Sequence, residues 1–382
     1  MRYRLEELFD LQMGKTPARA NLDYWKGTNK WVSISDLSGY DKYVTDTKEC
    51  ISDLGVSESG IKVVPKNTVI MSFKLSIGKT AITTEDVYTN EAIMAFIDKG
   101  VCEINTDYLY YLFSGTDWNK GTNKAVLGLT LNKATLSKKE IDIPDLHTQN
   151  EVVKKLDALS NVIQLQKLSL DKLDELIESR FNETFGDMIT NPMDWNRDKL
   201  GRVCDVRDGT HDSPSYYDEG YPLVTSKNVT NGTINFSNCN CICEADFNKI
   251  NERSKVNIGD ILMPMIGTIG KPVIVKTDKP FAIKNVALIK FYPNSLVNNT
   301  YIHTILKSDY FDRMVISKIR GGTQKFIALG DIRELTISIP PIEFQNQFAD
   351  FVTQVEKQKA TVQQSIDKLE TLKKSLMQEY FG

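Results

Sequence analysis

The sequence predicts an α+β protein in which two related globular domains are joined by two long antiparallel coiled-coil helices. Two observations lead to this fold class: the chain repeats itself after 196 residues, and each copy ends in a long segment with a heptad pattern. The expected boundaries are residues 1–145 for the first domain, 146–186 for the first helix, 187–341 for the second domain and 342–382 for the second helix. Because the copies are related, we expect a pseudo-twofold arrangement.

Short motifs of the first half recur in the second half at a constant distance. Ile143-Pro144, Gln149-Asn150 and Phe185-Gly186 return 196 residues later as Ile339-Pro340, Gln345-Asn346 and Phe381-Gly382. Upstream the correspondence is looser, because Gly78 corresponds to Gly270 at a distance of 192 residues and Asn90 to Asn285 at 195. The helices therefore keep their length, while the globular parts differ by a few residues.

Apolar residues in each helical segment recur at the spacing of a coiled-coil seam. The residues expected to pair the helices are Val152, Leu156, Leu159, Ile163, Leu170 and Leu173 in the first copy and Phe348, Val352, Val355, Val362, Ile366 and Leu369 in the second. Gln166, Lys359 and Lys373 interrupt the seam, and such polar positions can specify register and pairing. The alternative is that each amphipathic helix lies only on its own domain. The matched lengths, roughly 60 Å each at 1.5 Å per residue, favour an antiparallel pair.

Each globular part is predicted to end in a strand that stops at a proline before the helix begins. Ile141-Asp142-Ile143 precedes Pro144, and Ile337-Ser338-Ile339 precedes Pro340. Strand-like runs separated by glycine-containing turns fill both domains, so we expect antiparallel or mixed sheets. Residues 187–198 have the composition of a linker into the second domain.

Composition places the chain among ordinary globular proteins, with 41% hydrophobic and 25% charged residues in 382. It has no run of about 18 apolar residues, so we expect no membrane span. The first residues lack the apolar segment of a signal peptide. Six cysteines without paired spacing suggest reduced thiols, and we therefore expect a cytoplasmic protein.

The net charge of −3 by itself argues against a nucleic-acid partner. Residues 1–145 carry 18 basic against 20 acidic side chains, residues 187–341 carry 19 against 17, and both helical segments are acidic. A surface that binds phosphates must therefore come from the local arrangement of side chains.

Several fragments resemble catalytic or metal-binding motifs and fail on context, so we predict no catalytic residue and no metal site. Gly14-Lys15-Thr16 and Gly78-Lys79-Thr80 end like a phosphate-binding loop, but Phe9 and Phe73 occupy the required upstream glycine position. Asn191-Pro192-Met193-Asp194 lacks the second proline and the aromatic residue of an adenine methyltransferase motif. Cys239, Cys241 and Cys243 alternate without a histidine nearby, which favours a half-buried strand over a metal site.

Glycine-containing loops at matching places in both copies combine hydroxyl, amide, basic and aromatic side chains. Such sets suit phosphate contacts, hydrogen bonds to base edges, and stacking. Each loop alone could be an ordinary surface turn, and the recurrence favours DNA binding. The candidate DNA-binding residues are Lys15, Thr16, Arg19, Tyr24, Lys26, Lys79, Thr122, Asn123 and Lys124 in the first domain and Thr210, His211, Ser213, Tyr216, Tyr217, Lys227, Asn228, Lys271, Thr323, Gln324 and Lys325 in the second.

The order of these motifs, twice over, resembles the specificity subunits of type I restriction–modification systems along essentially the whole chain. The resemblance rests on the repeated Ile-Pro and Gln-Asn pairs at the start of each helix and on the late Gly-Thr loops. It also rests on two strand-turns, Trp31–Asp36 and Pro222–Asn228. Asp208–Pro214 is similar to the start of one common variety of target recognition domain.

The resemblance implies a non-catalytic subunit whose two target recognition domains each read one half of a split site in double-stranded DNA. It further implies two methyltransferase subunits docked on the helices, and restriction subunits with translocase and nuclease activity. S-adenosylmethionine and ATP with Mg would then bind those partners, with no cofactor on this chain. The helix length would set the gap between half-sites.

Three alternatives remain at this point. A specificity subunit of a type II system with a fused nuclease–methyltransferase partner would share every sequence feature described above. A free-standing enzyme that acts on DNA would show activity without partners. A scaffold that binds only proteins would leave no footprint on DNA.

Overall fold

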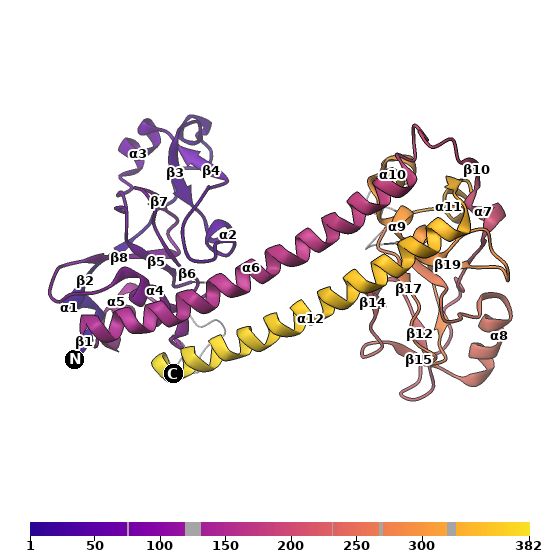
Figure 1. The fold of residues 1–382 in the computed structure, drawn as a ribbon. Coiled ribbons are helices and arrows are strands. Elements are labelled where there is room, and N and C mark those ends of the chain that lie inside the picture. Colours follow the sequence, from indigo (N-terminus) through magenta and orange to yellow (C-terminus); the bar gives the residue numbers. More distant parts are fainter. Residues whose placement is uncertain (75, 119–130, 231, 267–269, 319–325) are drawn as a thin grey trace. The chain divides into compact units, whose positions relative to one another are not determined.

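The computed structural model describes residues 1–74, 76–118, 131–230, 232–266, 270–318 and 326–382. The chain divides into two compact units: unit 1 comprises residues 1–167 and 364–382, and unit 2 comprises residues 168–363. Each unit holds one globular domain and a part of both long helices, α6 (Leu146–Phe185) and α12 (Ile342–Phe381), drawn in magenta and yellow in Figure 1. Unit 2 begins at Leu168 and the returning part of unit 1 begins at Gln364, which is 196 residues later. The division therefore follows the sequence repeat.

In its described residues, unit 1 contains a four-stranded and a three-stranded sheet. The first is antiparallel with the order β2-β8-β5-β6, formed by Phe9–Met13, Ile93–Asp98, Val69–Ser72 and Thr80–Ile82. The second has the order β4-β3-β7, formed by Glu49–Ile51, Asn29–Val32 and Tyr88–Thr89, with β3 and β7 parallel. β1 (Arg2–Arg4) pairs with β9 (Glu140–Asp142). The helices are α1 (Leu5–Leu8), η1 (Leu22–Trp25), α2 (Ile34–Leu37), α3 (Asp53–Ser59), α4 (Thr106–Gly115) and α5 (Lys133–Ser137).

The described part of unit 2 repeats this topology. Its four-stranded sheet is β11-β19-β16-β17, formed by Asp205–Asp208, Val286–Lys290, Ile261–Pro264 and Val273–Ile274. Its three-stranded sheet is β15-β12-β18, formed by Asn240–Ile242, Tyr221–Val224 and Ala282–Ile283, with β12 and β18 parallel. β10 (Asn196–Lys199) pairs with β20 (Thr336–Ile339), and β13 (Val229–Thr230) pairs with β14 (Thr233–Ile234). The helices are α7 (Leu200–Val203), η2 (Ser226–Asn228), α8 (Glu244–Ser254), α9 (Asn299–Lys307), α10 (Asp309–Met314), η3 (Ile316–Lys318) and α11 (Leu329–Arg333).

The central strands β5 and β16 are buried on both faces, which explains their continuous apolar sequences. Alternate residues serve different cores, because successive side chains of a strand point to opposite faces. In unit 1, Val69 and Met71 join the cluster beneath α4 and α6, whereas Ile70 faces the cluster of the three-stranded sheet. In unit 2, Met263 joins the cluster that includes α9 residues, whereas Leu262 faces the cluster of the three-stranded sheet.

The repeated Gln-Asn pairs hold the start of each long helix to its own domain. Gln149 is fully buried; its Oε1 accepts from the backbone N of Asn105 at 2.8 Å, and its Nε2 donates to the carbonyls of Glu103 at 3.0 Å and Pro144 at 2.9 Å. Asn105 Nδ2 donates to Asn150 Oδ1 at 2.7 Å.

Unit 2 has the same set of bonds. Gln345 is also fully buried, accepts from Asn298 at 2.8 Å, and donates to the carbonyls of Leu296 at 3.0 Å and Pro340 at 2.7 Å. Asn298 Nδ2 donates to Asn346 at 3.0 Å. The repeated motif is therefore a structural contact between the helix start and the loop before α4 or α9.

Parts of α6 and α12 pair within each unit, and the predicted coiled-coil fold class is confirmed. In unit 1, Gln166 donates to Ser365 Oγ at 2.9 Å, and Lys167 pairs with Glu370 at 2.8 Å. In unit 2, Lys359 Nζ lies 2.7 Å from Asp174. Within unit 1, Lys155 contacts Tyr380 and Gln166 contacts Ser365, so the partners run in opposite directions along the two helices, as an antiparallel pair requires. All twelve residues expected to pair the helices are buried or half-buried, but Val152, Leu156 and Phe348 belong to the domain cores.

One boundary expectation was wrong. Asn196–Asp198, which we expected to be linker, form most of β10 and pair in register with Ile337–Ile339 of β20. The partner strand lies more than 100 residues away in sequence, so local composition carried no signal for this pairing. Among the helices that the structure describes, none has the length and hydropathy to cross a bilayer.

Candidate nucleic-acid interface

The first predicted loop of each domain leaves the four-stranded sheet at a glycine that must remain small. A Cβ atom on Gly14 would collide with the carbonyl oxygen of Thr89 in β7, and one on Gly209 would collide with that of Ile283 in β18. The next residues form equivalent hydrogen bonds, from Lys15 N to Thr89 O at 2.8 Å and from Thr210 N to Ile283 O at 3.0 Å. The two loops are therefore anchored alike.

The residue after each of these positions contacts an asparagine that also recurs. In unit 1, Asn90 Nδ2 donates to Thr16 Oγ1 at 3.1 Å, and Thr16 also donates to Glu91. In unit 2, Asn285 Oδ1 lies 2.8 Å from His211 Nδ1. The same backbone position thus presents a hydroxyl in one domain and an imidazole in the other.

In unit 1 the predicted basic residues lie beside aromatic rings and acidic side chains. The Arg19 guanidinium lies 3.7 Å from the Trp25 ring centroid and pairs with Glu49, with one N–O distance of 3.0 Å. Lys26 pairs with Asp23 at 3.0 Å, with 69% and 71% of their side chains exposed. Exposed pairs of this kind contribute little to stability, so a phosphate could replace the acidic partner at small cost.

Two further members of this loop region are held by contacts within unit 1. Lys15 Nζ donates to the carbonyl of Ser59 at the end of α3. Tyr24 donates from its hydroxyl to Glu58 at 3.4 Å and remains half-buried. Lys15, Thr16, Arg19, Tyr24 and Lys26 therefore lie in segments tied to β7, α3 and β4.

In unit 2 one carboxylate contacts both a guanidinium and an imidazole. Asp208, whose side chain is 10% exposed, pairs through Oδ1 with Arg253 and through Oδ2 with His211 Nε2 at 2.8 Å. Hydrogen bonds to Asn285 and Asp208 raise the pKa of His211 above its usual 6.5. Nearby, Lys284 Nζ donates to Ser213 Oγ at 2.6 Å.

The remaining described candidates differ in exposure. Tyr216 and Tyr217 are 50% and 51% exposed, which leaves ring surface available for stacking. Lys79, Lys227 and Lys271 are exposed. The prediction that Asn228 faces DNA is not supported, because Asn228 is buried. Its Oδ1 accepts from the N and Oγ1 of Thr225 at 2.9 and 2.8 Å. It stabilises its own turn, a role that Asn residues often take in capping motifs.

Six candidates lie outside the described residues: Thr122, Asn123, Lys124, Thr323, Gln324 and Lys325.

Sequence reasoning missed Arg253, Glu49 and Glu91. Each comes from an element far along the chain from the loop it contacts: Arg253 is 45 residues from Asp208, and Glu91 is 75 residues from Thr16. No local pattern in α8 marks Arg253, since its role follows from the packing of α8 beside the end of β11.

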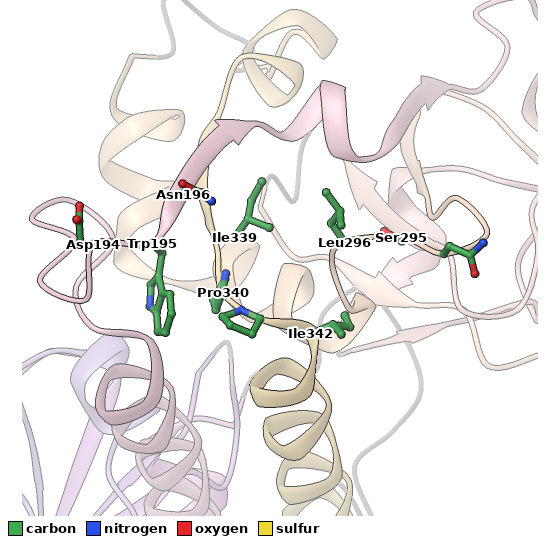
Figure 2. A pocket seen from close by; sticks show the side chains of 10 residues that line it. Asp194, Trp195, Asn196, Ser295, Leu296, Ile339, Pro340 and Ile342 are labelled. Carbon is green, nitrogen blue, oxygen red and sulfur yellow. The ribbon is translucent and has the colours of Figure 1, made fainter.

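The described residues hold no group of three or more His, Cys, Asp or Glu side chains arranged to bind a metal ion. Cys241 lies in β15 and Cys243 occupies the N-cap position of α8, and the described cysteines are all free thiols. One cavity of about 800 Å³ lies in unit 2 at the start of α12, and none of the candidate DNA-binding residues lines it. Figure 2 shows that Trp195, Leu296, Pro340 and Ile342 line it, so its walls are largely apolar.

The two related domains, their equivalent loops and the long paired helices define a class of duplicated proteins. Comparison with known proteins identifies the family. Residues 1–175 and 192–371 both match the family model described as "Type I restriction modification DNA specificity domain". Because these matches cover most of the chain, the protein belongs to the family of type I restriction–modification DNA specificity subunits, and the predicted resemblance is confirmed.

Individual relatives agree with this assignment. The chain is 23% identical to the type I restriction enzyme MjaIX specificity subunit of Methanocaldococcus jannaschii, over 91% of this chain and 85% of the relative. It is 20% identical to the EcoBI specificity subunit of Escherichia coli, over 76% and 68%.

Solved structures show the same fold over the whole chain. The type I S subunit from M. genitalium aligns with a TM-score of 0.54 at 12% identity, covering 100% of this chain and 96% of that one. A chain from a structural study of complex assembly and conformational transition in the type I R–M system aligns with a TM-score of 0.62 at 17% identity, covering 100% and 97%.

Proposed function

We propose that this chain is the non-catalytic subunit that gives a type I restriction–modification enzyme its DNA sequence specificity. Each globular domain would read one half of a split site in double-stranded DNA. Two methyltransferase subunits would bind the helices, and restriction subunits would complete the enzyme in the cytoplasm. S-adenosylmethionine and ATP with Mg would bind those partners.

The observation that carries this proposal is the pair of equivalent loops with different side chains. Gly14 and Gly209 anchor them identically, yet Lys15-Thr16 stands where the second domain has Thr210-His211. One scaffold that presents two chemistries can read two different sequences, because base edges are distinguished by the donors and acceptors that face them. The surrounding exposed cations and aromatic rings suit phosphate contacts and stacking.

A methylation map at single-base resolution tests the proposal. Cells that express the cognate methyltransferase subunits would be compared with and without this chain. We expect methylated sites that depend on the chain and that consist of two specified segments separated by an unspecified gap of constant length. Methylation that is independent of the chain, or a single contiguous site, would refute the proposal.

A further inference from the structure

Asp208 contacts two basic side chains in unit 2 that come from different elements. Arg253 belongs to the last turn of α8 and His211 to the loop after β11, and the two Asp208 oxygens accept one each. The carboxylate is nearly buried, whereas the Arg253 and His211 side chains are 66% and 64% exposed. The carboxylate is therefore turned inward, and both basic side chains remain accessible to solvent.

The hydrogen bonds of His211 favour its charged form. Its Nδ1 faces Asn285 Oδ1 and its Nε2 faces Asp208 Oδ2, both at 2.8 Å. Both partners are acceptors, and an imidazole ring can donate from both nitrogens only when it is protonated. The other charged group that faces the ring is Arg253, which opposes protonation, while the neighbouring Lys284 amine is bonded to Ser213. With His211 protonated, the cluster carries two positive charges against one negative.

Unit 1 has a cation at the equivalent place in its fold. There the helix that follows the edge strand β4 is α3, and Lys15 of the loop reaches its terminal carbonyl at Ser59. In unit 2 the helix that follows the edge strand β15 is α8, and Arg253 of that helix reaches Asp208 beside the loop. In both domains a basic side chain therefore connects the loop to the end of the helix. The loop supplies it in unit 1, and the helix supplies it in unit 2.

We propose that Arg253 and His211 together bind a backbone phosphate of the DNA half-site read by the second domain, with Asp208 as the residue that positions both. This inference rests on the proposed function. Among the residues that the structure describes, Arg253 contacts Asp208 through one terminal nitrogen, so its other N–H groups can donate to a phosphate oxygen. A phosphate contact fixes the position of a domain on the duplex and does not by itself select a base.

The test is binding of a cognate duplex by the full chain assembled with its methyltransferase subunits, measured over a range of salt concentrations. Arg253→Ala should weaken binding roughly tenfold and reduce the slope of log affinity against log salt by about 1. Arg253→Lys should retain most of the affinity, since a phosphate accepts a point charge.

Arg202→Ala provides a matched control, because Arg202 is 69% exposed and pairs with Asp198 at 3.2 Å in the same unit. It should leave both affinity and salt slope unchanged. Thermal unfolding of each variant would show that loss of binding is not loss of fold.

A pH series tests the roles of His211 and Asp208. Wild-type affinity should fall as pH rises through the raised pKa of His211, because the charged ring binds the phosphate. His211→Gln should flatten this profile, and Asp208→Asn should move its midpoint to lower pH. A purely structural Asp208 would leave the midpoint in place.

The outcomes separate this inference from the proposed function. If the wild-type complex binds its site and Arg253→Ala does not change affinity, the phosphate contact is refuted while sequence-specific binding stands. If Arg253→Ala changes the methylated sequence at one base pair, Arg253 reads a base and the phosphate contact is again refuted. If the wild-type complex shows no sequence-specific binding, the proposed function itself fails.

Discussion

Two buried glutamines each connect a long helix to its own domain through three hydrogen bonds. Gln149→Ala would leave the N–H of Asn105 and the carbonyls of Glu103 and Pro144 without their partner in a site that excludes water. We expect a loss of about 3 kcal/mol, because several buried polar groups lose partners together. Hydrogen exchange should show faster opening of α4.

Gln345→Ala should produce the same effect on α9 in unit 2 and spare α4. Gln164→Ala, an exposed position on α6, should change neither helix. Equal loosening of α4 and α9 by either single substitution would contradict a contact local to each domain.

His303 is a buried histidine whose charge state makes unit 2 sensitive to acid. Burial lowers the pKa of His303 to about 4, from a usual value of 6.5, and its Nε2 lies 3.0 Å from the carbonyl of Pro272. The unfolded chain therefore takes up a proton below pH 6.5, whereas the folded chain does so only near pH 4. The free energy of unfolding should fall by about 3 kcal/mol between pH 7 and pH 4.

Urea unfolding at several pH values measures this effect. His303→Gln should remove the fall in unfolding free energy that His303 causes between pH 7 and pH 4, even if the substitution also changes the stability at pH 7. His147→Gln replaces an exposed histidine and should leave the pH dependence as in the wild type. An unchanged acid dependence in His303→Gln would show that His303 is not the group responsible.

At the scale of elements, the last turn of each long helix completes the core of the domain it reaches. The Phe381 ring lies 5.6 Å from that of Tyr108 in unit 1, and Phe185 lies 4.7 Å from Tyr301 in unit 2. Phe381 also packs against Gly115, where any Cβ would be within about 3.0 Å of its ring. Each domain therefore needs the end of a helix whose sequence begins outside it.

Substitution of these two phenylalanines should destabilise different units. Phe381→Ala should cost about 2 kcal/mol in unit 1, since Phe381 is half-buried, and Phe185→Ala about 4 kcal/mol in unit 2, since Phe185 is fully buried. Limited proteolysis would locate the weakened unit. Leu372→Ala, at a 47% exposed position of α12, should have little effect. Cleavage of unit 2 in Phe381→Ala would contradict the conclusion that Phe381 stabilises the core of unit 1.

The element scale also shows where local patterns suffice. Heptad spacing predicted the seams of α6 and α12, and the alternating burial of β5 and β16 follows from the pleat of a strand. Local patterns could not place β10, because its only reason to be a strand is β20. They also could not show that Asn228 is buried, since its partners become its neighbours only when the turn forms.

At the scale of the whole molecule, equivalent residues of the two helices are always 196 residues apart in the sequence. Equivalent residues of the domains are 192 to 195 apart, so only the helices keep a constant length. If the chain reads a split site, the helix length controls the gap between half-sites. Deleting one heptad from both helices removes roughly 10 Å, or about three base pairs of DNA, and preserves the seam.

A methylation map of the doubly shortened chain would therefore show a smaller gap and unchanged half-sites. Deleting a heptad from only one helix is the control, because it breaks the match between the two seams and should abolish site-specific methylation. Altered half-sites with an unchanged gap would contradict the role of the helices as a spacer.

The sequence by itself determined the duplication, the two long helices and the α+β class of both domains. Repeats and hydrophobic periodicity depend only on the order of residues along the chain, so they can be recognised without the fold. It also identified the loops after Gly14 and Gly209 and the correspondence of Asn90 with Asn285, while the contacts of these asparagines with the loops came from the structure. Tertiary structure alone decided which side chains share a site: Arg253 meets Asp208, and Lys15 meets Ser59, only after the helices following β4 and β15 pack beside the loops. The physical reason is that such contacts depend on strand pairing and packing between residues far apart in the chain, and no local propensity encodes them.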